Sequence, residues 1–131
     1  MTVRSAVIVL VLCGLRVSPL QAQQPLTMQV EVNYLLSYVE TSGCSFYRNG
    51  SWYDGAQARA HLQTKYDYLA TRKLVASADD FIDKGASKST FSGKPYKIRC
   101  GTAAEVESGP WFHGVLARFR AAAPAHGDSR H

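Results

Sequence analysis

Cys44-Ser-Phe-Tyr-Arg-Asn-Gly-Ser-Trp-Tyr53 is the stretch of sequence that decides the fold. It places Asn49-Gly50 between two runs that are rich in aromatic residues. Asn-Gly in this setting is the strongest short-range signal of a β-hairpin. A two-residue loop fixes the register of the two strands. The expected cross-strand pairs are Arg48 with Ser51, Tyr47 with Trp52, and Phe46 with Tyr53.

Helical patterns flank the hairpin on both sides. Between Thr27 and Glu40, apolar residues recur at helical spacing and form one stripe on an amphipathic helix: Met28, Val32, Leu35, Leu36 and Val39. After the hairpin, Asp54 and Gln57 form a capping-box pattern, which predicts a second helix that runs to about Thr71. Ser77-Ala-Asp-Asp80 repeats this pattern and predicts a short third helix.

A strand and a helix complete the pattern. Tyr96-Lys-Ile-Arg-Cys100 alternates as a strand, with Lys97 and Arg99 turned away from its apolar face. A last helix starts at Ser108, and its buried face is expected to carry Trp111, Val115 and Phe119. The order of elements predicts a small single α+β domain. About four helices are expected to pack on a three-stranded antiparallel sheet, made of the hairpin and the one later strand.

The first 22 residues have the pattern of a secretory signal peptide. Arg4 precedes the apolar run Ala6–Leu15, and the segment ends on the small residue Ala22. A transmembrane helix needs roughly 20 apolar residues, and Arg16 interrupts this run, so we expect cleavage and no transmembrane span in the mature chain. Cys13 lacks the small preceding residue that lipid modification requires. The sequence therefore predicts a periplasmic or secreted protein.

The rest of the chain has the length of one domain. Residues 23–120 are expected to form this domain, and residues 121–131 are expected to be a frayed tail. Loss of Arg4 and Arg16 with the signal peptide lowers the formal net charge from +5 to +3. The mature chain is thus only mildly basic, and export removes it from nucleic acid. We therefore expect no nucleic-acid partner.

Two cysteines, Cys44 and Cys100, remain when Cys13 leaves with the signal peptide. An even number of cysteines in an oxidising compartment indicates a disulfide. The alternatives are a metal pair and a catalytic thiol. Both are disfavoured because the chain has no CxxC motif and no histidine beside either cysteine. A disulfide that closes a loop of this length stabilises the fold by about 4 kcal/mol.

Several motifs follow one another in an order that resembles a known family. They are Cys44-Ser-Phe-Tyr-Arg-Asn-Gly50, Tyr53-Asp-Gly-Ala56, His61-Leu62, Lys65-Tyr66, Ala78-Asp-Asp-Phe-Ile82, Ser92-Gly-Lys-Pro-Tyr96 and Cys100. Over roughly residues 27–120, the chain resembles the small exported bacterial proteins catalogued as domain of unknown function 5329. Asp79-Asp80 stands where a more Glu-like pattern is expected, which leaves the capping chemistry unchanged. The resemblance implies a bacterial, periplasmic protein and assigns no activity.

The second predicted helix carries two basic residues on its apolar side. At about 100° per residue, His61 and Lys65 fall on the same side as Leu62 and Leu69. Two interpretations are open. In the first, the Lys65 stem packs against apolar neighbours and its ammonium reaches water past the edge of the helix. In the second, Lys65, His61 and Arg48 face an anionic ligand group, and the ammonium lowers the pKa of the imidazole.

The segment from Lys84 to Arg99 is strongly basic, and Asp83 is the single acid near it. A solvated surface explains such a run, and the functional alternative is contact with an anionic envelope component such as lipid head groups, lipopolysaccharide or wall polymer. The candidate contacts are Lys88, Lys94 and Lys97. Tyr47 and Trp52 would add a stacking surface if their face of the sheet is open, but we expect them in the core beneath a helix.

The sequence lacks the motifs of common enzymes. It contains no GxSxG and no HExxH motif, so no catalytic residue, metal or cofactor is expected. The preferred hypothesis is a non-enzymatic binding or interaction module of the cell envelope. Its candidate ligand contacts are Arg48, His61, Lys65, Lys88, Lys94 and Lys97. The alternative hypothesis is a small envelope enzyme that uses His61 and Lys65 in a polar pocket.

Overall fold

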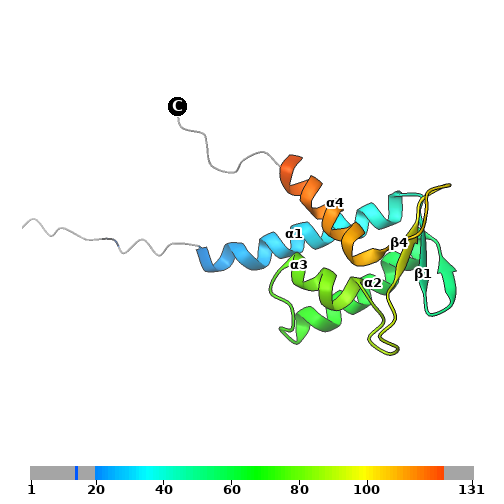
Figure 1. Ribbon diagram of the computed structural model, residues 1–131. Coiled ribbons are helices and arrows are strands. Elements are labelled where there is room, and N and C mark those ends of the chain that lie inside the picture. The colour runs from blue at the N-terminus through cyan, green and yellow to red at the C-terminus, as the bar shows by residue number, and fades with distance from the viewer. Residues whose placement is uncertain (1–13, 15–19, 123–131) are drawn as a thin grey trace, which may run out of the picture.

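The computed structural model describes residue 14 and residues 20–122, and it has the predicted α+β architecture (Figure 1). Helix α1 (Leu20–Thr41) leads into the hairpin of β1 (Ser45–Arg48) and β2 (Ser51–Tyr53). The chain continues through α2 (Gly55–Thr71), α3 (Ala78–Phe81) and the π-helical turn η1 (Ile82–Ala86). It then forms β3 (Lys97–Arg99), β4 (Val106–Glu107) and α4 (Ser108–Ala122).

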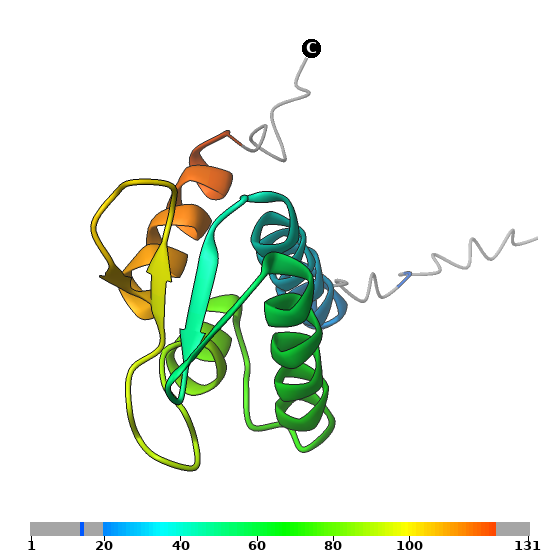
Figure 2. The ribbon, with the colours of Figure 1, turned by 90° about the vertical axis from the view of Figure 1, so that its right-hand side faces the viewer.

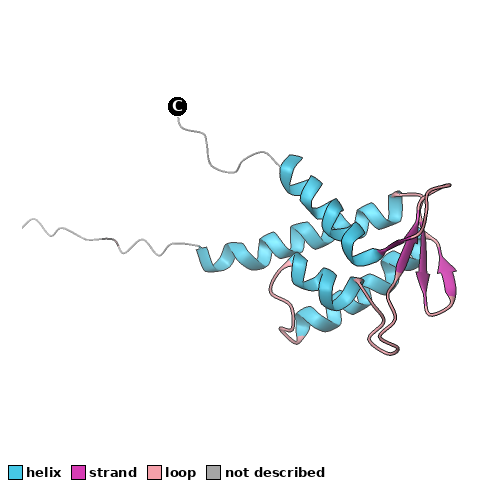
Figure 3. Cartoon of the chain, in the orientation of Figure 1, coloured by secondary structure: helices cyan, strands magenta, loops and turns pink. Residues whose placement is uncertain are grey.

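The strands form one antiparallel sheet in the order β2-β1-β3-β4, and Figure 3 shows the helices on one side of it. The prediction of three strands is too low by one. The fourth strand, β4, pairs Val106 with Ile98 and Glu107 with Lys97. Both of its residues are exposed, and a two-residue strand is too short to show the alternation from which a strand is recognised.

The hairpin has the predicted register at all three residue pairs. Asn49 and Gly50 adopt positive φ angles of 47° and 89°, as a two-residue hairpin turn requires. Asn49 also ties the hairpin tip to the loop of residues 88–95. Its Nδ2 donates to Ser89 Oγ at 3.2 Å, and its Oδ1 accepts from Ser92 Oγ at 2.8 Å. Figure 2 shows this loop beside the hairpin tip.

The core lies between the helices and the inner face of the sheet. The predicted stripe on α1 is confirmed, because its central residues are at most 1% exposed: Val32, Leu35, Leu36 and Val39. Ile98 of β3 and Phe81 of α3 meet this stripe and are equally buried. Alternation along β3 therefore turns Lys97 and Arg99 outward, as predicted.

The prediction for the buried face of α4 is confirmed for Val115 and confirmed in part for Trp111 and Phe119. The other large side chains that α4 buries almost completely are Phe112 and Leu116, at 2% and 1% exposure. Trp111 and Phe119 are half-buried at the edge of the core, where their rings contact Tyr38 and Tyr34. The apolar side of α4 is thus broader than one residue per turn.

The predicted start of α2 is confirmed in detail. Asp54 Oδ1 accepts from the Gln57 amide at 2.8 Å, and Gln57 Oε1 accepts from the Asp54 amide at 3.2 Å. Gly55 lies so close to α1 that a Cβ there would be 2.5 Å from the Val39 carbonyl oxygen. The start of α2 is therefore held both by its cap and by backbone contact with the end of α1.

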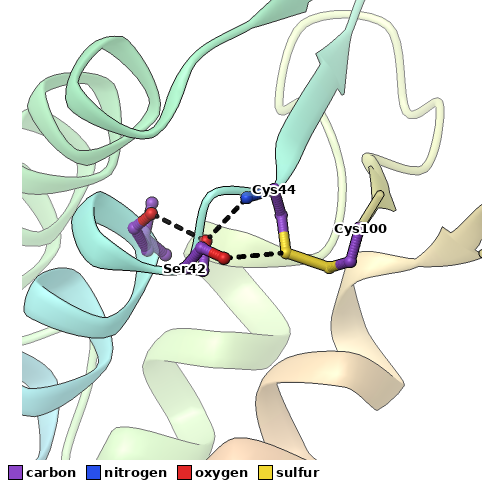
Figure 4. The surroundings of a disulfide bond; sticks show 4 residues. Ser42, Cys44 and Cys100 are labelled. Atoms are coloured by element: carbon purple, nitrogen blue, oxygen red, sulfur yellow. Dashed lines mark hydrogen bonds between the residues drawn. A yellow bond between two sulfur atoms is a disulfide. The ribbon is translucent and has the colours of Figure 1, made fainter. Parts of the chain in front are cut away.

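The predicted disulfide between Cys44 and Cys100 is present (Figure 4). It joins the residue before β1 to the residue after β3, which are neighbouring strands of the sheet. Ser42 supports the turn that leads into Cys44. Its hydroxyl donates to the Val39 carbonyl oxygen at 3.0 Å and accepts from the Cys44 amide at 3.2 Å.

The two predicted ends of the domain fall near the limits of the described residues. Apart from residue 14, the signal peptide up to residue 19 and the tail from residue 123 lie outside them. Residues 20–22 of the predicted signal peptide already belong to α1, and α4 includes the first two residues of the predicted tail. Within the described part of the chain, no helix combines the length and the apolar character needed to cross a bilayer.

Candidate functional site

The structure brings three of the candidate binding residues together. Arg48 is the last residue of β1, and its Nη1 donates to His61 Nδ1 on α2 at 2.9 Å. Lys65 lies one turn further along α2 and donates from Nζ to the Tyr96 hydroxyl at 3.1 Å. That hydroxyl is also 3.3 Å from His61 Nε2. Arg48, His61, Lys65 and Tyr96 thus form one group, which we call the basic site.

The Lys65 side chain is half-buried, and its ammonium ends on polar atoms of the protein. Besides the Tyr96 hydroxyl, Nζ donates to the Lys88 carbonyl oxygen at 3.2 Å. It also lies 4.9 Å from the centre of the Tyr96 ring, within the range of a cation–π contact. The end of the lysine is therefore positioned between α2 and the segment that leads into β3.

The charges of the basic site have one sign. Among the residues that the structure describes, none of its basic side chains forms an ion pair with a carboxylate. Burial, together with the charges of Arg48 and Lys65, lowers the pKa of His61 to about 4. Burial and the Arg48 charge lower the pKa of Lys65 to about 8. At neutral pH the site therefore holds two positive charges and a neutral imidazole.

A cavity of about 130 Å³ adjoins the basic site. Arg48, His61 and Tyr96 form part of its wall. Most of the remaining wall is apolar and is contributed by both strands of the sheet centre and by α2 and α4: Phe46, Ala58, Leu62, Ile98 and Phe112. The arrangement places a guanidinium and an imidazole at the side of an apolar space.

Comparison with known proteins identifies the family to which these residues belong. A family model described as a family of unknown function, DUF5329, matches residues 26–120. The chain belongs to this family. The match includes the whole basic site and both cysteines of the disulfide, and it agrees with the resemblance seen in the motifs.

One relative of this chain is a bacterial protein described as uncharacterised. The uncharacterised protein YfeK of Salmonella typhimurium strain LT2 is 35% identical over 69 residues, which are 52% of this chain and 56% of that protein. The chain thus spans little more than half of the curated relative that it matches. No solved structure matches the chain.

The three lysines predicted as contacts lie apart from the basic site. Lys88 meets it only through its backbone carbonyl oxygen, and the Lys88 and Lys94 side chains are exposed on the loop of residues 88–95. The Lys97 side chain is exposed on the outer face of the sheet, where its Nζ lies 5.7 Å from the centre of the Tyr47 ring, and the residue also borders the cavity beside the basic site. The structure thus separates the predicted contacts into a compact group and three dispersed lysines.

The expectation that Tyr47 and Trp52 lie beneath a helix is wrong. Tyr47 pairs with Trp52 on one side and with Lys97 on the other. Alternation along β1 places Tyr47 on the face opposite to the buried Phe46. The Arg99 guanidinium lies 4.2 Å from the centre of the Trp52 ring on this outer face. Both aromatic rings are half-buried by each other and by these basic side chains.

Sequence analysis did not identify Tyr96 or Tyr53 as part of the site. Tyr96 joins His61 to Lys65 through its hydroxyl, and Tyr53 lies beneath the Arg48 guanidinium at 5.1 Å from its ring centre. A signal for Tyr53 was present, because the hairpin register and strand alternation place Arg48 and Tyr53 near each other on one face. For Tyr96 no such local signal existed, since it is 31 residues from Lys65.

A second group of charged residues joins α1, α3 and α4. Arg120 donates two hydrogen bonds to the buried Glu31, at 2.6 and 3.0 Å, and one to Asp79 at 2.8 Å. His113 lies 3.3 Å from an oxygen of Asp79 and 2.8 Å from an oxygen of Asp83. We call these five residues the α4 ion cluster. Acidic and basic groups alternate through it, which is the arrangement expected of a structural ion network.

Proposed function

We propose that this chain is an exported, non-enzymatic binding protein of the cell envelope, and that the basic site holds an anionic group of its ligand. The observation that carries the proposal is the lack of a carboxylate partner for Arg48 and Lys65 among the described residues. Two partly buried cations close to each other reduce stability unless a counter-charge is supplied. An anionic ligand supplies that charge.

The geometry suits an oxyanion. Arg48 is half-buried and stacked on Tyr53, so its guanidinium is held in place and presents planar donors to a carboxylate or phosphate. Lys65 adds a second donor, and neutral His61 contributes hydrogen bonding without further charge. A bound anion also favours the protonated form of Lys65. Binding should therefore weaken as the pH rises above about 8, the pKa of Lys65 in the free protein.

The stability of the protein in different salts tests this proposal. Sodium sulfate or sodium phosphate is compared with sodium chloride at equal ionic strength, and the melting temperature is measured. An anion that binds the folded state raises the melting temperature in proportion to RT ln(1 + [L]/Kd). We expect this rise in the parent chain and a much smaller one in Arg48→Met and Lys65→Met. The exposed Lys94→Met is the matched control.

A rise of equal size in all four proteins would attribute the effect of these salts to general exclusion from the surface. The absence of a rise with any anion would contradict anion binding at the basic site.

Export is supported by the leader pattern of residues 1–22 and by the Cys44–Cys100 bond, because disulfides persist in oxidising compartments. Intact mass spectrometry of the protein from the periplasm of its native host tests this part. The expected mass corresponds to a chain that begins at Gln23 and carries two thiols that react only after reduction. Retention of residues 1–22, a lipid-sized mass increment or freely reacting thiols would contradict it.

The dispersed lysines support a weaker, additional contact with an anionic envelope surface. Reversal of charge at Lys88, Lys94 and Lys97 is expected to reduce binding to purified envelope fractions at low salt. Unchanged binding would mean that these three lysines do not contact the envelope, and that only the basic site contributes to binding.

Proton transfer is the second candidate function. It is favoured by the chain of hydrogen-bonding groups from His61 through the Tyr96 hydroxyl to Lys65, which is an arrangement that an acid–base pair requires. The test is His61→Gln, which keeps a hydrogen-bonding side chain and removes the base. Turnover of ester and phosphoester substrates that is present in the parent and lost in this variant, with folding and anion binding intact, would favour the enzyme. An inactive parent would favour binding.

A further inference from the structure

Core residues form much of the wall of the cavity beside the basic site. Phe46 and Ile98 contribute from the inner face of the sheet, Leu62 from α2 and Phe112 from α4. All four are at most 8% exposed. Well-packed cores leave few spaces larger than a water molecule. A space of about 130 Å³ between these elements is therefore an unusual feature of a domain of this size.

The polar atoms in the cavity wall are distributed unevenly. Ser108 donates its hydroxyl to the Ala86 carbonyl oxygen at 2.6 Å, and the Gln57 side chain accepts within the capping box of α2. The Ser108 hydroxyl and the Gln57 side-chain oxygen are thus already bonded within the fold. The Arg48 guanidinium and the His61 imidazole bond to each other, and Arg48 retains further donors. The Arg48 guanidinium thus places a charged group with remaining donors at the cavity wall.

We infer that the ligand of the basic site is an amphipathic carboxylate or similar anion whose compact apolar group, about the size of a benzene ring, occupies this cavity. The inference rests on the proposed function and specifies its ligand class. An apolar cavity of roughly 150 Å³ in another protein core stays dry and takes up benzene, and the present volume is close to that. Arg48 then pairs with the anionic group at the cavity wall, and Lys65, which donates to the Tyr96 hydroxyl, adds a second positive charge nearby.

The shape of the site disfavours two other ligand classes. A small inorganic anion satisfies Arg48 and Lys65 but leaves the apolar wall empty, so it gains nothing from burial. A long acyl chain provides burial but exceeds the volume of about 130 Å³. A ring or short branched chain that carries one anionic group uses both parts of the site at once.

Titration calorimetry with a graded series of probes tests the inference on the full mature chain. The probes are acetate, benzoate, cyclohexanecarboxylate and benzyl alcohol, at constant pH and ionic strength. Burial of a ring is expected to make benzoate and cyclohexanecarboxylate bind at least about tenfold more tightly than acetate. Benzyl alcohol lacks the charge and is expected to bind more weakly than benzoate. Arg48→Met should remove most of the benzoate affinity.

Two variants on α2 test whether the bound ring occupies the cavity. Ala58→Leu adds three carbon atoms to the buried wall, and we expect it to weaken benzoate binding by at least about tenfold. Ala60→Leu makes the same change at an exposed position of the same helix and should leave benzoate binding unchanged. The probe series on the parent chain requires no variant, so the inference remains testable if Ala58→Leu does not fold.

The outcomes separate the inference from the proposed function. If acetate, benzoate and cyclohexanecarboxylate bind with equal affinity and all lose affinity in Arg48→Met, anion binding at the basic site is supported and the apolar subsite is wrong. If no anion binds, both are wrong. If benzoate binds equally to the parent and to Arg48→Met, the cavity takes apolar groups without the basic site, and the link between them is overturned.

Discussion

The basic site and the α4 ion cluster are both built from partly buried charged residues, but only one of them is balanced. In the α4 ion cluster, Arg120 is bonded to Glu31 and Asp79 at 2.6–3.0 Å. In the basic site, Arg48 and Lys65 have no carboxylate partner among the described residues. Folding by itself favours the first arrangement. The second lowers stability, which is typical of a site that serves a ligand.

The largest change in stability is expected from the removal of Arg120, which balances the charge of the α4 ion cluster. Removal of one partner from a buried ion pair costs about 3–5 kcal/mol. Glu31 is 8% exposed, whereas the Arg120 side chain is 44% exposed, so water will offset part of the loss. We expect Arg120→Ala to lower the free energy of unfolding by about 2 kcal/mol, measured by urea denaturation. Arg118→Ala, at an exposed position of the same helix, is the control and should change it by less than about 0.5 kcal/mol.

An equal effect of Arg118→Ala and Arg120→Ala would mean that the α4 ion cluster does not stabilise the fold.

The corresponding change in the basic site is expected to act in the opposite direction. Lys65→Met keeps an unbranched side chain of similar length and removes a partly desolvated charge that Arg48 repels. We expect the free energy of unfolding to rise by about 1 kcal/mol in chloride buffer. Lys94→Met removes an exposed charge and should have almost no effect. A fall in stability for Lys65→Met would show that its bonds to Tyr96 and Lys88 outweigh the cost of its charge.

The pH dependence of the free energy of unfolding tests the cost of the Lys65 charge separately. The pKa of Lys65 falls from 10.5 to about 8 on folding, so the unfolded chain binds more protons between these values. The contribution of Lys65 to the free energy of unfolding must therefore become more favourable as the pH rises through this range. The raised pKa of Tyr96 acts in the opposite direction, but it is present in both proteins that are compared.

The measurement is the difference in unfolding free energy between the parent and Lys65→Met at pH 7.5 and pH 10. The difference should shrink at the higher pH, because only the parent carries the lysine whose pKa folding lowers. A constant difference would mean that Lys65 titrates normally in the folded protein.

The smallest effect is expected at the exposed end of the α4 ion cluster. The His113 side chain is 38% exposed, and its acidic neighbours Asp79 and Asp83 are 44% and 66% exposed. Ion pairs at this exposure contribute about 0.2–1 kcal/mol. His113→Gln should therefore cost about 0.5 kcal/mol in urea denaturation. A cost as large as that of Arg120→Ala would mean that the interactions of His113 stabilise the fold as much as those of Glu31 with Arg120.

Much of the fold could be predicted because its signals are local. The Asn49-Gly50 turn fixes its register through backbone angles that two adjacent residues adopt. The Asp54–Gln57 capping box spans one turn of α2. His61 and Lys65 could be placed on one side of a helix because side chains four residues apart are neighbours. Each of these features depends on residues close in sequence.

The sequence by itself thus determined the hairpin, the helix starts, the pairing of the two cysteines and the position of two basic residues on the apolar side of α2. Only the tertiary structure decided what surrounds those residues. The Tyr96 hydroxyl, the lack of a nearby carboxylate among the residues that the structure describes and the cavity all arise where α2, β1 and the start of β3 meet. Likewise, Glu31 finds Arg120 across 89 residues. The periodicity of apolar residues indicates which face of a helix or strand is buried. The charge balance of a site depends instead on groups that only the packing of distant segments brings into contact.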